Sequence, residues 1–330
     1  MNANAIERYV RLILGNLSMR HDYQSLLSGQ TRMLVVEGKT DCDFFKGKLA
    51  NNVICEIANK AFAGSSERIN CKEAVKYVIS GQTTYAKVLS NSLSDIKKLI
   101  LYGFVDLDYE DSSSITNNQP RLFVSDTHDL ETLMISTDAE ILRRIEDGVI
   151  SEEDVRKTLF YAYQIAVIRD ALFSLNTNLV DLKWISGSND IDFNVLIKDE
   201  TIEVSIVLNY LSSKLEKPLS KNQMDTLCRR VTGNAALKKK LDKNNRWKLN
   251  WKEFDFETVP DYWKLVNGHD ILSILRVVNH TIHDRFRQAQ EEGNRRAFEN
   301  VLINEYDFQT FKETMVYQKM RKENVIKVID

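Results

Sequence analysis

The sequence predicts an α/β fold in which a parallel sheet is flanked by helices and followed by a mainly helical C-terminal half. Residues 99–105 form a nearly continuous apolar run, which is typical of a parallel strand covered on both faces. Short apolar runs alternate with helical periodicity on both sides of this run, as they do in βαβ units. Beyond residue 137 the alternation fades and helical patterns dominate.

The first part of the chain carries the predicted sheet. Its predicted strands are residues 33–36, 53–57, 99–105 and 122–124. The first predicted helix has Thr40 as its N-cap, and the others are residues 67–79, 85–96 and 128–135. Phe44, Phe45 and Leu49 are expected to point from the first of these helices into the core. A helical lead-in, residues 1–29, precedes the sheet.

The second part is predicted to be mainly helical, with one small hairpin. The helices are 152–175, 204–214, 221–231, 235–243, 270–287, 295–303 and 311–322. The hairpin lies within 184–204 with its turn near Asp199 and Glu200. The expected domains are therefore the lead-in, a sheet domain at 30–136, and a mainly helical domain at 137–330 that binds substrate or a partner.

Length and composition are those of an ordinary soluble protein, with 330 residues, 43% hydrophobic, 28% charged and a formal net charge of −2. The four cysteines have no CxxC spacing and no nearby histidine pair, which argues against a zinc site or a disulfide framework. No signal-like segment occurs, and no apolar run approaches the ~20 residues of a membrane helix. We therefore expect a cytoplasmic protein.

Charge is unevenly distributed along the chain. Residues 106–154 contain fourteen acidic residues and three arginines, whereas residues 214–253 contain twelve lysines and arginines and four acids. This polarity is consistent with an acidic metal site and a phosphate-binding surface. A solvated charged helix is the commoner meaning of a charge run.

Carboxylates directly follow two of the predicted strands. Asp106 and Asp108 follow the third strand, and in an extended backbone residues i and i+2 point to the same side. Glu37 follows the first strand, and Gly38 after it permits a sharp turn. Sites in parallel sheets form beyond the carboxyl ends of the strands, and crowded carboxylates favour a hard divalent cation. Each feature alone is also explained by a turn or a helix dipole.

The fourth strand is followed by further polar groups, namely Asp126, His128, Asp129 and Glu131. They are candidates for the same edge of the sheet. For Asp129 and Glu131, helix capping is the alternative, and His128 either positions a phosphate or base or is a surface histidine.

Taken together, Val35-Val36-Glu37-Gly38 and the later Gly103-Phe104-Val105-Asp106-Leu107-Asp108 resemble the motifs of the Toprim superfamily. That superfamily includes bacterial primases, type IA and type II topoisomerases, and the overcoming-lysogenization-defect nucleases. The resemblance covers roughly residues 28–136. It implies a Toprim-like parallel sheet in which Glu37, Asp106 and Asp108 hold divalent metal ions and act on phosphodiesters.

Two later segments, 123–131 and 267–272, resemble elements of stand-alone Toprim-like proteins from bacterial defence loci. Among these proteins, they resemble the nuclease effectors of PARIS-type anti-phage systems. This resemblance implies an RNase-like toxin that acts on transfer RNA and is restrained by an ABC-type ATPase partner.

The chemistry of phosphodiester hydrolysis assigns roles to these carboxylates. One or two Mg²⁺ or Mn²⁺ ions would activate water and offset charge on the phosphate. Asp106 is expected to be the central ligand and Asp108 a ligand directly or through water, while Glu37 completes the coordination or acts as general base. Mg²⁺ usually binds through only one or two carboxylates, so not every acid need contact it.

Three further residues are candidates for the same site. Asp41 lies four residues after Glu37 and is either a metal ligand or a helix-dipole partner. Glu131 is a candidate ligand of a second ion. Lys39, next to Glu37, is the candidate catalytic cation for phosphate, with a solvated surface lysine as the alternative.

The basic region is interleaved with Trp247 and Trp251, a pattern that suits nucleic acid because bases stack on aromatic rings and cations meet phosphates. A helical surface over two core tryptophans is the alternative. The candidate nucleic-acid-binding residues are Arg229, Arg230, Lys238, Lys239, Lys240, Arg246 and Lys248.

The sequence therefore predicts a Mg²⁺-dependent nuclease that cleaves RNA, with transfer RNA as the expected substrate and DNA as the less favoured one. The expected partners are an ABC-type ATPase and, in the active state, a second copy of the chain. The alternatives are a non-catalytic regulatory module with the same fold and a structural subunit of an ATPase complex.

Overall fold

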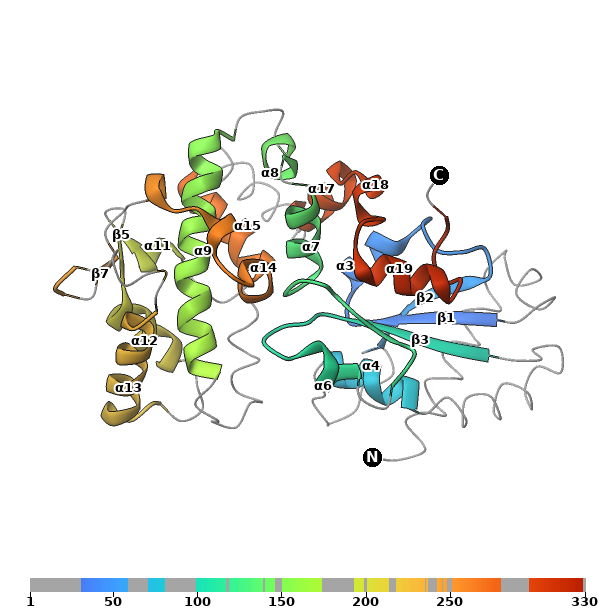
Figure 1. Ribbon diagram of the computed structural model, residues 1–330, viewed down its shortest axis with the longest axis horizontal. Coiled ribbons are helices and arrows are strands. Elements are labelled where there is room, and N and C mark those ends of the chain that lie inside the picture. The colour runs from blue at the N-terminus through green and yellow to red at the C-terminus, as the bar shows by residue number, and fades with distance from the viewer. Residues whose placement is uncertain are drawn as a thin grey trace. The chain divides into compact units, whose positions relative to one another are not determined.

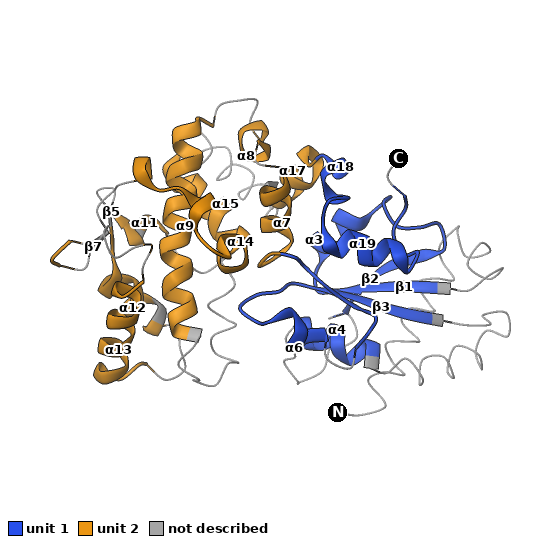
Figure 2. Cartoon of the chain, viewed as in Figure 1, with its two compact units in different colours: residues 1–126, 307–330 blue, residues 127–306 orange. Residues whose placement is uncertain are grey.

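The structure is a computed structural model that describes residues 31–58, 71–80, 99–116, 119–138, 140–145, 150–173, 193–198, 201–213, 218–234, 236, 242–244, 246–247, 251–279 and 297–328. The predicted lead-in (1–29) and helix 85–96 lie outside these residues. The chain forms two compact units, residues 1–126 with 307–330 (the sheet unit) and residues 127–306 (the helical unit) (Figure 2). The domain boundaries given above stay a prediction.

The sheet unit contains a four-stranded parallel sheet in the order β2-β1-β3-β4, which confirms the predicted α/β class (Figure 1). The strands are β1 (Thr31–Val36), β2 (Val53–Ile57), β3 (Leu99–Val105) and β4 (Leu122–Val124). Each predicted strand is thus present. Met33, Leu34, Val35 and Val36 are all at most 1% exposed, as expected of a strand covered on both faces.

Helices α3 (Lys39–Phe45) and α4 (Cys71–Ser80) cover opposite faces of this sheet. The Phe104 ring of β3 packs edge-on against Phe45 of α3, with ring centroids 5.1 Å apart. The preceding residue, Gly103, points to the other face, since side chains alternate along a strand. A Cβ atom at Gly103 would lie 2.8 Å from Val75 of α4, so only glycine fits this close approach.

Helix α3 starts two residues earlier than predicted. Gly38 is the N-cap residue, and its N–H donates to Asp41 Oδ2 at 2.8 Å. The assignment of Thr40 as N-cap is therefore wrong. The Asp41 side chain folds back onto the start of the helix and caps it, which places Thr40 in the first turn.

The last residues of the chain return to the sheet unit, which the sequence did not indicate. Helices α18 (Phe308–Phe311) and α19 (Met315–Lys322) belong to it, and Leu49 forms a β-bridge with Ile326. The prediction of one helix over 311–322 is wrong, because the Thr314 side chain accepts the Tyr317 N–H and starts a new helix. Among the described residues of this unit, the remaining helix is α6 (Ser112–Thr116).

The helical unit confirms the prediction of a largely helical second half. In the part of this unit that the structure describes, the helices are α7 (Leu130–Thr137), α8 (Ile141–Arg144), α9 (Glu152–Phe173), α11 (Phe193–Leu196), α12 (Val204–Ser213), α13 (Lys221–Thr232), α14 (Tyr262–Leu265), α15 (Gly268–Val278) and α17 (Ala297–Glu305), with 3₁₀ turns η4 (Trp251–Glu253) and η5 (Phe256–Thr258). The long helix α9 is central, because α8, α12, α13, α14, α15 and η4 all contact it.

The predicted hairpin is also present, as antiparallel strands β5 (Ile197–Lys198) and β6 (Thr201–Glu203). A third strand, β7 (Arg246–Trp247), pairs with β6 and was not predicted. Residues 246–247, which the sequence analysis assigned only to the basic region, therefore also form a strand of this small sheet.

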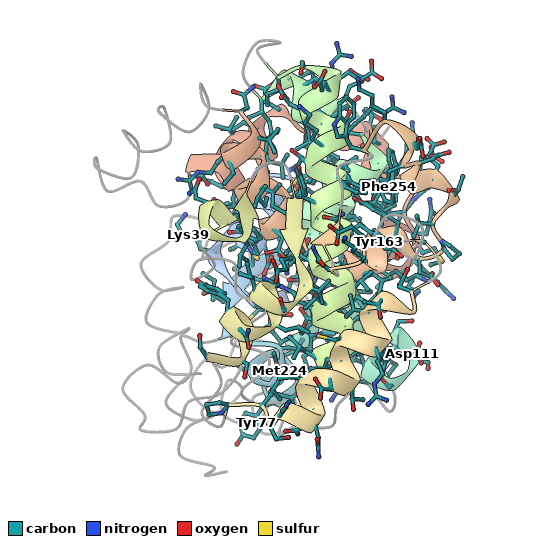
Figure 3. All side chains as sticks on the ribbon, turned by 90° about the vertical axis from the view of Figure 1, so that its left-hand side faces the viewer. Lys39, Tyr77, Asp111, Tyr163, Met224 and Phe254 are labelled. Atoms are coloured by element: carbon teal, nitrogen blue, oxygen red, sulfur yellow. The ribbon has the colours of Figure 1, made fainter. Side chains whose placement is uncertain are left out.

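An aromatic cluster fills part of the interior of the helical unit (Figure 3). Tyr163 of α9 stacks on Phe254 with ring centroids 5.6 Å apart, and on Tyr262 at 5.7 Å. Trp251 is 8% exposed, which agrees with its alternative interpretation as a core residue. Within the described residues, no helix is both long and apolar enough to span a membrane.

Candidate functional site

Glu37 and Asp106 meet at the carboxyl end of the sheet. Glu37 follows β1 and Asp106 follows β3, and these strands are neighbours in parallel register. The Asp106 N–H donates to Glu37 Oε1 at 2.9 Å. Strand pairing therefore brings the Glu37 carboxylate to the backbone of Asp106, 69 residues away in the chain.

Asp108 adopts an unusual backbone conformation immediately after β3. Its φ angle is 53°, in the left-handed region that non-glycine residues seldom occupy. Such conformations are found preferentially at functional sites. The turn directs the Asp108 carboxylate to Lys72 of α4, whose Nζ lies 2.5 Å from Asp108 Oδ2.

Lys72 is the residue at this site that the sequence did not reveal. Its side chain is 1% exposed, and Nζ donates to the Leu107 carbonyl at 3.2 Å and lies 3.3 Å from Glu110 Oε1. Burial lowers the pKa of a lysine, but the charges of Asp108 and Glu37 outweigh it and raise the pKa of Lys72. One lysine among many gives no signal in a sequence, since its position depends on how α4 packs on β3.

The electrostatic environment of Glu37 is unusual for a carboxylate. Burial and the negative charge of Asp108 raise its pKa to about 8, with Asp41 adding to the effect and Lys72 opposing it. Perturbed carboxylates of this kind are concentrated at functional sites, although structural networks also produce them. Asp41 is therefore close enough to influence Glu37 while its own carboxylate caps α3.

Lys39 lies on the exposed side of α3. Its side chain is 62% exposed, and Nζ pairs with Asp43 Oδ2 at 2.5 Å. Its predicted catalytic role is thus unsupported by any contact with Glu37, and it stays a prediction. Asp126, which follows β4, binds the N-terminus of α19 instead, because its Oδ2 accepts the N–H groups of Met315 and Val316.

The basic residues belong to the helical unit. Arg229 and Arg230 are exposed on the last turn of α13, where Arg229 Nε donates to the Asp225 carbonyl and Arg230 lies 3.9 Å from Asp170 Oδ2. Lys238, Lys239, Lys240 and Lys248 lie outside the described residues, as does the side chain of Arg246. Their predicted contact with nucleic acid stays a prediction.

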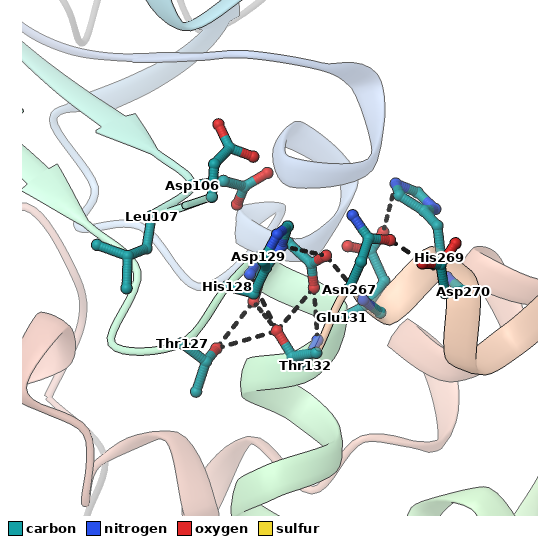
Figure 4. A network of polar contacts seen from close by, with 12 residues as sticks. Asp106, Leu107, Thr127, His128, Asp129, Glu131, Thr132, Asn267, His269 and Asp270 are labelled. Carbon is teal, nitrogen blue, oxygen red and sulfur yellow. Dashed lines mark hydrogen bonds and ion pairs between the residues drawn. The ribbon is translucent and has the colours of Figure 1, made fainter. Parts of the chain in front are cut away.

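In the helical unit, Asp129 caps two helices at once (Figure 4). Its carboxylate accepts the Thr132 N–H of α7 at 2.8 Å and the Gly268 N–H of α15 at 2.8 Å, and it also contacts His128 Nδ1 at 3.2 Å. Although burial raises the pKa of Asp129, the hydrogen bond and charge of His128, the charge of His269 and the Thr132 N–H lower it to about 2. His128 is fully buried, so it is not a surface histidine.

Glu131, the predicted ligand of a second ion, lies in the helical unit and contacts a histidine. His269 Nε2 is 3.9 Å from Glu131 Oε1, and His269 Nδ1 is 3.7 Å from Glu299 Oε1 of α17. Burial lowers the pKa of this imidazole, but the charges of Glu131, Glu299 and Asp129 raise it to about 10. A charged His269 therefore links α7, α15 and α17.

His269 should make the stability of the helical unit depend on pH in the alkaline range. Its stabilising effect is complete below the unfolded-state pKa of about 6.5 and is lost as pH rises through 10. Because the side chain is 35% exposed, solvent screening limits the loss to about 1–2 kcal/mol. Urea unfolding at pH 6.5 and pH 10 should show a larger decrease for wild type than for His269→Gln. Equal decreases would contradict this assignment.

The oxygen atoms of Glu37, Asp106 and Asp108 are suitable ligands for a hard divalent cation, but the three carboxylates are not arranged around one point. Within the described ranges, no group of three or more His, Cys, Asp or Glu side chains is placed to hold a metal ion. Glu37 and Asp106 are in contact, whereas Asp108 is paired with Lys72. Two carboxylates are sufficient for Mg²⁺, which completes its shell with water.

Comparisons with models of known protein families, with curated proteins and with solved structures found no match to this chain. The class of protein is thus defined by the fold alone, as an α/β protein with a four-stranded parallel sheet and a largely helical C-terminal half.

Proposed function

We propose that this chain is a metal-dependent nuclease of the Toprim superfamily that cleaves phosphodiester bonds. The observation that carries the proposal is the contact between Glu37 and Asp106 at the ends of neighbouring parallel strands. A glutamate after one strand and an Asp-x-Asp after another is the motif on which the resemblance rests. The left-handed Asp108 and the raised pKa of Glu37 give further support.

At such a site, Glu37, Asp106 and Lys72 would have different roles. Glu37 and Asp106 would hold Mg²⁺ or Mn²⁺, which when bound supplies charge compensation and an activated water. The Asp106 N–H fixes one oxygen of Glu37, leaving the other oxygen of that carboxylate to act as ligand or base. Lys72 keeps Asp108 in place through a buried ion pair.

The substrate and partners are proposed from the family resemblance. The motifs resemble those of the PARIS-type effectors, called AriB, whose partner AriA is an ABC-type ATPase. We therefore propose RNA, with transfer RNA first, as the substrate of a toxin restrained by an AriA-like ATPase and active as a homodimer. The basic residues of α13 favour a polyanionic substrate.

A nuclease assay on the purified full-length chain tests this function. Total cellular RNA, transfer RNA and double-stranded DNA are incubated with the protein and Mg²⁺ or Mn²⁺, with EDTA as the control. Cleavage that requires the metal, with RNA cut in preference to DNA, is the expected result. A protein free of any ATPase partner that cleaves neither nucleic acid with either metal would contradict the proposal.

A second candidate function is a non-catalytic regulatory or structural subunit of an ATPase complex. It is favoured by the pairing of Lys72 with Asp108 and by the absence of a three-carboxylate group among the described residues. In this case wild type and a Glu37→Gln variant would be equally inert towards nucleic acid and would bind an ATPase partner equally well.

A further inference from the structure

The buried side chain of Lys72 places its ammonium group between the carboxylates of Asp108 and Glu110. The Nζ atom of Lys72 lies 2.5 Å from Asp108 Oδ2 and 3.3 Å from Glu110 Oε1, and it donates to the Leu107 carbonyl at 3.2 Å. These three oxygens come from the turn that directly follows β3. Lys72 thus has an all-oxygen environment of the kind that hard cations prefer.

Burying the Lys72 ammonium group costs hydration free energy, and its carboxylate partners must offset that cost. Burying an ammonium group removes several kcal/mol of hydration, so buried lysines are almost always paired. The side chain of Lys72 is 1% exposed, whereas those of Asp108 and Glu110 are 29% and 26% exposed. The lysine is therefore the enclosed member of the cluster, and the carboxylates surround it.

The same contacts divide the carboxylates into two groups. Asp108 and Glu110 lie against Lys72 Nζ, while the Glu37 carboxylate accepts the backbone N–H of Asp106. A site with two divalent ions would need carboxylates around each ion. Because Asp108 and Glu110 share the Lys72 ammonium group, we assign a single divalent ion to Glu37 and Asp106 among the described residues.

We propose that Lys72 is a resident cation of the carboxylate site, which takes the place of a second metal ion, so that the site binds one divalent ion. This inference rests on the proposed function, since it concerns the number of ions at the same site. It predicts that the ammonium group stays bound to Asp108 when the metal is bound.

Counting bound Mn²⁺ tests the proposal. Mn²⁺ binding to metal-free protein is measured by isothermal titration and by the electron paramagnetic resonance signal of the free ion. Wild type should bind one Mn²⁺ per chain at this site, and Lys72→Met should bind two, because Asp108 and Glu110 lose their cation. Lys327→Met is the control, since Lys327 belongs to the same sheet unit and its Nζ donates to the Gly47 carbonyl at 2.8 Å. Lys76 is unsuitable, because its Nζ lies 4.0 Å from Glu110 Oε2. Lys327→Met should keep the wild-type count.

A second measurement uses wild type alone, so the test does not depend on the folding of Lys72→Met. The protein is treated with an amine-acetylating reagent with and without saturating Mn²⁺, and acetylation of Lys72 and Lys76 is followed by peptide mass spectrometry. Lys72 should stay protected in both conditions. Acetylation of Lys72 that increases at least tenfold with Mn²⁺ would show that the ion displaces the lysine, which overturns the proposal.

The outcomes separate this inference from the proposed function. Two Mn²⁺ ions per wild-type chain, or one ion in both wild type and a folded Lys72→Met, would overturn the role of Lys72 and leave a metal site in place. No Mn²⁺ binding to either protein would overturn the metal-dependent nuclease itself, and the inference with it.

Discussion

Replacing Glu37 with glutamine is expected to lower metal-dependent cleavage of RNA by about 10²- to 10⁴-fold, the usual effect of losing a general acid or base. Glutamine keeps a side-chain oxygen that can accept the Asp106 N–H, so the hydrogen bond between the ends of β1 and β3 is retained. The substitution removes the negative charge that binds metal or accepts a proton. Initial rates of cleavage of a labelled transfer RNA at saturating Mg²⁺ give the measurement.

Glu73→Gln is the matched control for this prediction. It makes the same chemical change in the sheet unit, on α4, where Glu73 is 54% exposed and pairs with Lys76. Its activity should be within a factor of about two of wild type, since a surface ion pair contributes about 0–1 kcal/mol. If Glu37→Gln keeps more than a tenth of the wild-type rate while its thermal unfolding is unchanged, Glu37 does not act in the reaction.

Replacing Arg169 with methionine is expected to destabilise the helical unit by about 3–5 kcal/mol, the usual cost of breaking a buried ion pair. Arg169 Nη2 of α9 donates to Asp270 Oδ1 of α15 at 2.8 Å, and the two side chains are 2% and 1% exposed. Burial raises the pKa of Asp270, and the charge of Arg169 opposes that rise. Without the arginine, Asp270 must be buried as an unpaired charge or take up a proton. Urea unfolding at neutral pH measures the loss.

The double variant Arg169→Met/Asp270→Asn tests the cause of this loss. It should be more stable than Arg169→Met alone, because the uncompensated charge is removed. Arg143→Met is the control, since Arg143 pairs with Glu140 on the surface and the two side chains are 48% and 64% exposed. Its effect should not exceed about 1 kcal/mol. A double variant no more stable than the single one would show that packing around Arg169, and not its charge, matters.

Local pattern predicted most of the secondary structure. The strands β2, β3 and β4 were predicted with the bounds that the structure gives, and β1 differs only at its start. A buried parallel strand is a short continuous apolar run, and that signal needs no tertiary information. Helix ends were less accurate, because the start of α3 is capped by the Asp41 side chain and that of α19 by the Thr314 side chain, and several polar residues nearby were equally able to act as caps.

The candidate site likewise has features that the sequence predicted and features that it did not. The proximity of Glu37 and Asp106 could be predicted, because parallel strands end at a common edge of the sheet. Asp126 shows the limit of this argument, since its carboxylate turns to the N-terminus of α19, a helix almost two hundred residues away in the chain. The capping function of Asp129 likewise depends on Gly268, which reaches it only because α15 packs on α7.

The sequence by itself determined the parallel sheet, the helical second half and the placement of carboxylates after two of the strands, since each follows from residue spacing over a short range. Only the tertiary structure decided which cation meets those carboxylates. Lys39, the neighbour of Glu37 in the chain, is exposed and pairs with Asp43, whereas Lys72 is buried against Asp108. The physical reason is that a charge is buried only where packing and its partners offset the loss of hydration, which depends on contacts between distant segments.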